Sequence, residues 1–121
     1  MQAMLTLCSF VLVHGLNGGY TKTWTCTTGD SDVTWPKDLL PGVQPQTRVL
    51  SFGYSGDVYK NPSHSGIRDI ARSLLSSLKL RRHSDRDRPI VFLGHCLGGL
   101  IVKQASHTIV YCPFVNDREP C

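Results

Sequence analysis

The chain has 121 residues, of which 40% are hydrophobic and 18% charged, and its formal net charge is +4. This length fits one domain and excludes a second, and the ordinary composition excludes a chain that is disordered throughout. No apolar stretch reaches the roughly 18 residues of a membrane span. The basic stretch 81–88 is interrupted by acidic residues and lacks aromatic residues for base stacking, which is evidence against nucleic-acid binding.

The N-terminal third is predicted to form one buried strand followed by a long loop. Phe10–Val13 is a continuous apolar run, which is typical of a strand buried on both faces. The glycine-rich residues 14–19 end this strand as a flexible loop. Residues 20–47 are rich in threonine, glycine, proline and aspartate, and within them we expect one short helix over Val33–Leu40, with both tryptophans packing the loop down.

The remaining elements alternate between strands and helices. Strands are predicted over Arg48–Tyr54 and Ile90–Leu93. Apolar side chains recur at helical spacing from Ile67 to Leu78, which predicts a helix with Ser65 as its cap. A last helix is expected over Gly98–Val110.

This alternation predicts an α/β fold, a small three-layer sandwich whose mainly parallel sheet has about three strands. The domain covers residues 1–110, and residues 111–121 form an aperiodic C-terminal tail that we leave unassigned. A sheet this narrow exposes its outer edges, and an exposed edge invites pairing with a protein partner.

Residues 94–99, Gly-His-Cys-Leu-Gly-Gly, have the pattern of a nucleophile elbow with cysteine at its centre. The strand-to-helix turn holds the central residue in a strained conformation, so side chains two positions before and after it would collide. Gly94 and Gly98 remove those collisions, and Gly99 continues the turn. Cys96 then starts a helix, where the positive end of the helix dipole favours a reactive thiolate.

Ligands gather at the carboxyl ends of strands in open α/β sheets, where the loops 14–19, 53–57 and 94–99 are expected to converge. Acyl transfer builds negative charge on an oxygen, which needs two preorganised donors. The backbone N–H groups of Leu16, next to Gly15, and of Leu97 are the candidates.

With these motifs the chain resembles the α/β-hydrolases, and among them the serine-esterase or lipase-like domains that are often fused to NACHT, ankyrin or tetratricopeptide regions. The resemblance implies that Cys96 occupies the position of the nucleophilic serine, that Leu16 and Leu97 supply the oxyanion hole, and that the substrates are carboxylic or lipid esters and thioesters. The matching segments are Val11–Gly18, Trp35–Pro41, Arg48–Tyr54 and Gly94–Ala105.

The chain departs from this family in two ways, because cysteine replaces serine and the strands that carry the acid and the base are absent. His107 would lie about 16 Å along the last helix at ~1.5 Å per residue, out of reach of the thiol. We therefore expect a truncated hydrolase domain that is inactive alone; the alternatives are a non-catalytic interaction or regulatory module and a fragment of a longer hydrolase. The candidates for the catalytic base and acid after Cys96 are His107, Asp117 and Glu119.

Two other histidines and the cysteines complete the sequence evidence. His14 and His95 each belong to a motif in which histidine more often orients a loop than acts as a base. No metal or cofactor is expected, since the spacing of His95, Cys96, His107 and Cys112 matches no common zinc site. Five cysteines without a C-x-x-C motif predict a reducing, intracellular compartment, and peripheral membrane association is compatible with this chain.

Overall fold

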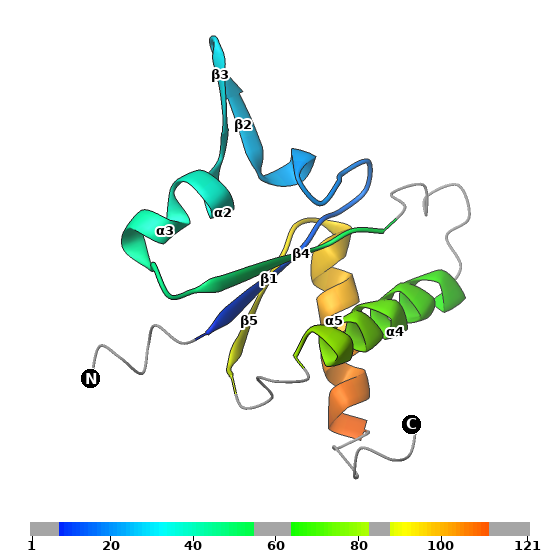
Figure 1. Cartoon of the computed structure of the whole chain (residues 1–121). Coiled ribbons are helices and arrows are strands. Elements are labelled where there is room, and N and C mark those ends of the chain that lie inside the picture. Colours follow the sequence, from blue (N-terminus) through cyan, green and yellow to red (C-terminus); the bar gives the residue numbers. More distant parts are fainter. Residues whose placement is uncertain (1–7, 55–63, 83–87, 112–121) are drawn as a thin grey trace.

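The computed structural model describes residues 8–54, 64–82 and 88–111. At its centre is a parallel three-stranded sheet in the order β4-β1-β5 (Figure 1). β1 spans Ser9–Val13, β4 spans Arg48–Phe52 and β5 spans Ile90–Gly94. The three predicted strands are confirmed, with β4 two residues shorter than expected because its ladder with β1 ends at the pair Val13 and Phe52.

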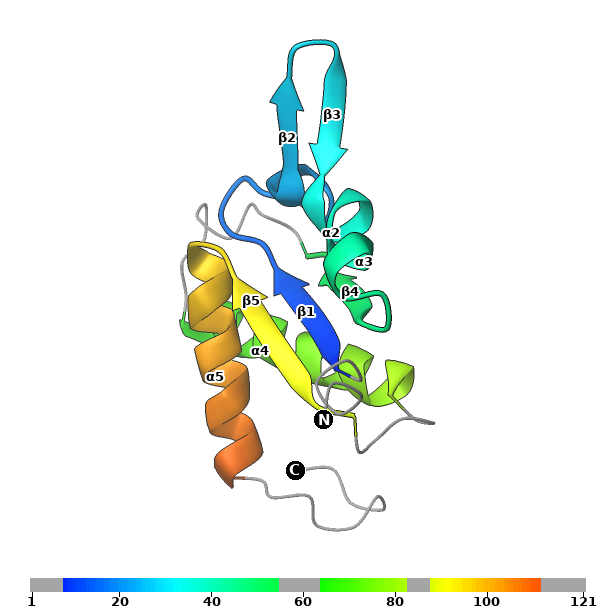
Figure 2. The ribbon, with the colours of Figure 1, turned by 90° about the vertical axis from the view of Figure 1, so that its left-hand side faces the viewer.

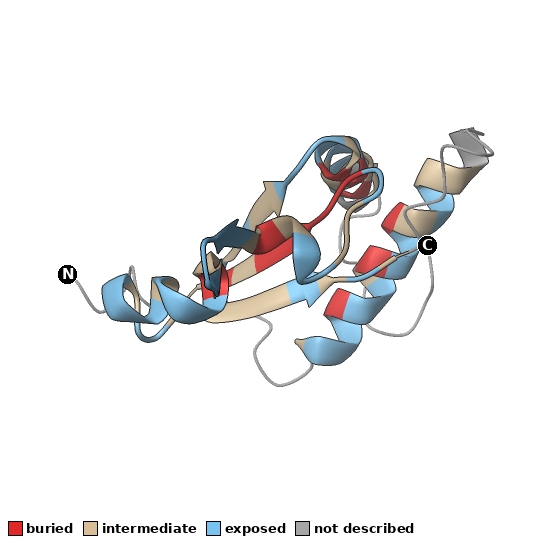
Figure 3. Ribbon diagram, turned by 90° about the horizontal axis from the view of Figure 1, so that it is seen from above, coloured by how far each residue is buried: buried red, intermediate tan, exposed pale blue. Residues whose placement is uncertain are grey.

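Two long helices cover one face of this sheet. α4 spans His64–Arg81 and α5 spans Leu97–Tyr111, so both predicted helices are confirmed. Ser65 lies inside α4 rather than capping it, because the helix already begins at His64. Val11 and Val13 point from β1 toward these helices and are fully buried. Figure 3 shows the buried residues on β1 and on the inner sides of the two helices.

The apolar stripe of α4 explains this packing. Ala71, Leu74 and Leu78 recur at three- and four-residue spacing, and each is at most 7% exposed. They meet Ile101 and Ala105 of α5, both fully buried. The core therefore lies between the helix pair and the sheet face that carries the odd-numbered residues of β1.

The segment between β1 and β4 differs from the prediction. The expected helix over Val33–Leu40 is wrong at its start, because Val33 and Thr34 belong to a β-hairpin. The turn explains the difference, since Gly29 has a φ of 64°, the conformation that a two-residue hairpin turn requires at its first position. The elements are η1 (Lys22–Trp24), β2 (Thr25–Thr28), β3 (Ser31–Thr34), α2 (Trp35–Asp38) and α3 (Leu40–Val43).

This segment lies on the side of the sheet opposite α4 and α5 (Figure 1, Figure 2). The Ser51 hydroxyl on that face of β4 donates a hydrogen bond to the Tyr20 carbonyl. Trp24 is 8% exposed and packs edge-on against Trp35 at 6.3 Å between ring centroids. The two tryptophans thus pack the segment down, as predicted. The α/β class and the three-stranded, mainly parallel sheet are confirmed.

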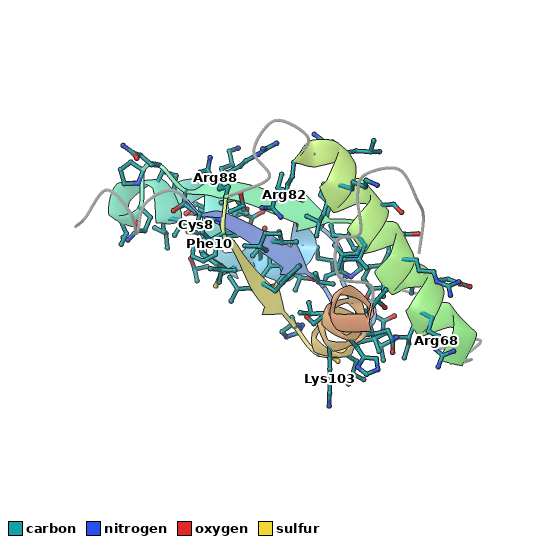
Figure 4. The ribbon with its side chains drawn as sticks, turned by 90° about the horizontal axis from the view of Figure 1, so that it is seen from below. Cys8, Phe10, Arg68, Arg82, Arg88 and Lys103 are labelled. Carbon is teal, nitrogen blue, oxygen red and sulfur yellow. The ribbon has the colours of Figure 1, made fainter. Side chains whose placement is uncertain are left out.

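Arg88 ties the amino ends of the strands together. Its guanidinium donates hydrogen bonds from Nη2 to the carbonyl oxygens of Cys8 at 3.1 Å and Gln46 at 2.6 Å. Arg82, the residue that follows α4, donates to the Arg88 carbonyl. Figure 4 shows Arg82, Arg88 and Cys8 at the same end of the sheet. The site described below lies at the opposite, carboxyl end.

Several predicted features fall outside the described residues. They are residues 55–57 of one converging loop, the middle of the basic stretch, and positions 112–121 of the tail with Cys112, Asp117 and Glu119. In the described part of the chain, no helix combines the length and the apolar character needed to cross a membrane.

Candidate active site

Cys96 lies at a sharp turn between β5 and α5. It has a φ of 56°, in the left-handed region that a residue with a side chain rarely adopts. Two backbone hydrogen bonds between residues three apart in sequence close the turn. They run from the Gly98 N–H to the His95 carbonyl at 2.9 Å and from the Gly99 N–H to the Cys96 carbonyl at 3.1 Å. The thiol is solvent-exposed and forms no disulfide. This is the backbone geometry of a nucleophile elbow.

The glycines on either side of Cys96 allow close backbone approaches. A Cβ atom on Gly98 would lie 2.0 Å from the Val13 carbonyl oxygen, and one on Gly94 would lie 2.6 Å from the Cα atom of Gly99. A Cβ atom on Gly99 itself would meet nothing within 4 Å. The elbow therefore requires glycine at positions 94 and 98 for steric reasons. At position 99 a side chain would fit, and it is the backbone of Gly99 that packs against Gly94.

The loop after β1 lies directly against the elbow. A Cβ atom on Gly15 would be 2.6 Å from the Cys96 Cβ atom and 3.2 Å from the Leu97 nitrogen. In the described residues, neither the Leu16 nor the Leu97 backbone N–H has a hydrogen-bond acceptor. The structure thus brings Gly15, and with it the start of the loop that continues to Leu16, against Cys96 and Leu97.

The described histidines have other partners. His14 is fully buried, stacks on the Tyr54 ring, and has both ring nitrogens within hydrogen-bonding distance of backbone groups. His95 is exposed and lies edge-on to Trp24, with 6.4 Å between ring centroids. His107 belongs to the body of α5. Among the side chains that the structure describes, no histidine, aspartate or glutamate is hydrogen-bonded to the Cys96 sulfur.

Tyr54 is the residue of this site that sequence reasoning missed. Its hydroxyl donates a hydrogen bond to the His14 carbonyl at 2.7 Å. Burial, and secondly the negative charge that Cys96 carries as a thiolate, raise the pKa of Tyr54 from 10.0 to about 12. The neutral phenol is thus favoured by the fold, and this contribution to stability is complete below pH 10 and is lost as the pH rises toward 12. The only sequence signal was an aromatic residue at the end of a predicted strand.

No metal centre is evident in the part of the chain that the structure describes. These residues contain no group of three or more histidine, cysteine, aspartate or glutamate side chains that could hold a metal ion.

The chain is similar to one region of a longer protein. It is 32% identical to Protein SERAC1 of Bos taurus over 110 residues and 32% identical to Protein SERAC1 of Danio rerio over 114 residues. Protein SERAC1 of Homo sapiens is 30% identical over 110 residues. Each match covers 78% of this chain but 17% of the relative, so the chain spans about one sixth of the curated relatives' length. No protein-family model matches the chain. No solved structure gives a significant match.

Substitution at two adjacent glycines tests the elbow geometry. We expect Gly98→Ala to lower the free energy of unfolding by about 3 kcal/mol or more, because the new methyl group overlaps the rigid Val13 carbonyl. Gly99→Ala is the matched control, and we expect it to raise stability by roughly 0.5–1 kcal/mol, because its methyl group enters open space in a helix. Urea unfolding followed by circular dichroism measures both, and equal effects of the two substitutions would contradict the geometry.

Proposed function

We propose that this chain carries the nucleophile and the oxyanion hole of an esterase- or lipase-type α/β-hydrolase domain, and that it reacts with carboxylic esters or thioesters. One observation carries the proposal: an exposed cysteine, held at a φ of 56°, lies in a turn that Gly15 approaches closely. The N–H groups of Leu16 and Leu97, in these two segments, have no acceptor among the described residues. The resemblance of the glycine loop and the elbow to α/β-hydrolases supports the same chemistry.

The reaction follows from these groups. The Cys96 thiolate attacks the acyl carbon, a carbon–sulfur bond forms, and the carbonyl electron pair moves onto oxygen. The Leu16 and Leu97 N–H groups donate hydrogen bonds to this oxyanion, the kind of interaction worth about 3 kcal/mol per donor in acyl transfer. When the carbonyl re-forms, the bond to the alkoxide or thiolate breaks, and the leaving group takes a proton from water. The product is a thioester on Cys96.

Release of the acyl group is the slow step. Water must be deprotonated as it attacks the acyl carbon of the thioester, and the Cys96 sulfur then leaves. In the described residues no histidine or acidic side chain is hydrogen-bonded to this sulfur. Loss of the base from a nucleophile unit costs about 10⁶ in rate. We therefore infer that this chain alone is acylated once. In the alternative reading, a fragment of a longer hydrolase, the acid and base come from residues outside this sequence.

Acylation by p-nitrophenyl acetate tests the proposal. We expect a burst of p-nitrophenolate stoichiometric with the protein, followed by a slow steady state, and an acetyl group on Cys96 in the mass spectrum of the digested chain. Cys96→Ala should abolish the burst, whereas Cys26→Ala, at another exposed cysteine, should retain it. A burst that survives Cys96→Ala would contradict the assignment of the nucleophile, and sustained Cys96-dependent turnover would contradict single acylation.

A second candidate function is a non-catalytic module that binds a protein partner through its sheet edges. The observation in its favour is that β4 and β5 each pair only with β1 among the described strands of the sheet, which leaves both outer edges unpaired. Val91 in β5 is 41% exposed. Unpaired edge strands with apolar side chains are prone to pair with another chain.

Light scattering during size-exclusion chromatography separates this candidate from the first. If the edges pair, the measured mass should rise with protein concentration, and Val91→Lys in the edge strand should reduce that rise, because lysine on an edge opposes pairing. Lys103→Ala, a substitution on exposed helix surface, serves as the control. A monomer that persists at every concentration would count against edge pairing.

A further inference from the structure

We propose that Tyr54 is the positioning residue of the oxyanion hole. Its contacts with His14, which we call the clasp, fix the peptide that presents the Leu16 N–H beside Cys96. The inference rests on the proposed function and deepens it by naming a residue outside the motifs that suggested the site. Tyr54 follows β4, whereas the elbow follows β5 and the loop follows β1.

Tyr54 holds His14 through three contacts. Its backbone N–H donates to His14 Nε2 at 3.3 Å, its ring stacks on the imidazole at 4.1 Å with 5° between the planes, and its hydroxyl donates to the His14 carbonyl at 2.7 Å. Because the Tyr54 N–H donates to Nε2, the contact fits the tautomer whose proton is on Nδ1. Tyr54 therefore fixes the position, the ring plane and the tautomer of His14.

His14 passes this restraint to the oxyanion-hole peptide. Its Nδ1–H donates to the Gly15 carbonyl at 3.0 Å, and the Gly18 N–H donates to the same oxygen at 3.1 Å. This carbonyl and the Leu16 N–H belong to one planar trans peptide, in which the two groups point in opposite directions. Anchoring the carbonyl on the His14 side therefore aims the Leu16 N–H away from it and leaves that donor unpartnered.

The phenol is suited to a permanent role as donor. Its pKa of about 12 keeps the proton on the hydroxyl throughout the neutral and mildly alkaline range. The residue after His14 also lies against the nucleophile, because a Cβ atom on Gly15 would be 2.6 Å from the Cys96 Cβ atom. The clasp and the nucleophile thus belong to one site.

Two reagents distinguish positioning from packing. Acylation of Cys96 by p-nitrophenyl acetate passes through an oxyanion, whereas alkylation by iodoacetamide does not. Tyr54→Phe removes the hydroxyl but keeps the ring, and we expect it to slow acylation about tenfold, the effect of one lost hydrogen bond of ordinary strength, and to leave the alkylation rate unchanged. Tyr20→Phe is the matched control at an exposed tyrosine, and we expect it to change neither rate.

The outcomes separate this inference from the function on which it rests. If the unsubstituted chain is not acylated on Cys96, the proposed function fails. If it is acylated but Tyr54→Phe leaves both rates unchanged, or changes both equally, the positioning role is overturned. Nitrogen NMR of the unsubstituted chain gives a test that no folding defect can obscure: we expect the His14 proton on Nδ1, and a proton on Nε2 would overturn the clasp.

Discussion

The approach of two backbones at the carboxyl end of the sheet governs the rest of this site. The chain leaving β1 and the elbow leaving β5 come so close that a side chain on Gly98 would overlap the Val13 carbonyl and one on Gly15 would overlap Cys96. Only glycine allows this contact without displacement of either segment. Because of it, the loop that carries the Leu16 N–H adjoins the turn that carries Cys96 and the Leu97 N–H.

The remainder of the fold holds these two segments in register. β1 is the central strand, parallel to β4 and β5, and its inner face is buried under α4 and α5. Arg88 binds the opposite ends of the strands, so the sheet is fixed at both ends. Strain at Cys96 is tolerated because the surrounding packing determines where β5 and α5 lie, which is how proteins commonly maintain unfavourable backbone conformations at reactive residues.

Local patterns in the sequence predict the parts of this structure that local physics determines. Apolar runs give the three strands, helical spacing gives α4 and α5, and the glycines around Cys96 give the elbow. The β2–β3 hairpin was missed, although its Gly29-Asp30 turn was a readable signal, because the polar residues around it suggest a loop. The contact between His14 and Tyr54 joins residues 40 positions apart. It follows from the pairing of Val13 with Phe52, a register that spacing within either strand does not reveal.

The central claim is that the Leu16 and Leu97 N–H groups together bind an oxyanion formed on Cys96. The most direct measurement is amide NMR of the chain before and after a peptide aldehyde forms a hemithioacetal on that thiol, since the adduct carries an oxygen where the oxyanion would lie. The account predicts that the Leu16 and Leu97 amide protons both shift downfield and that a Cys96→Ala chain shows neither shift. Formation of the adduct with both amide signals unmoved would contradict it.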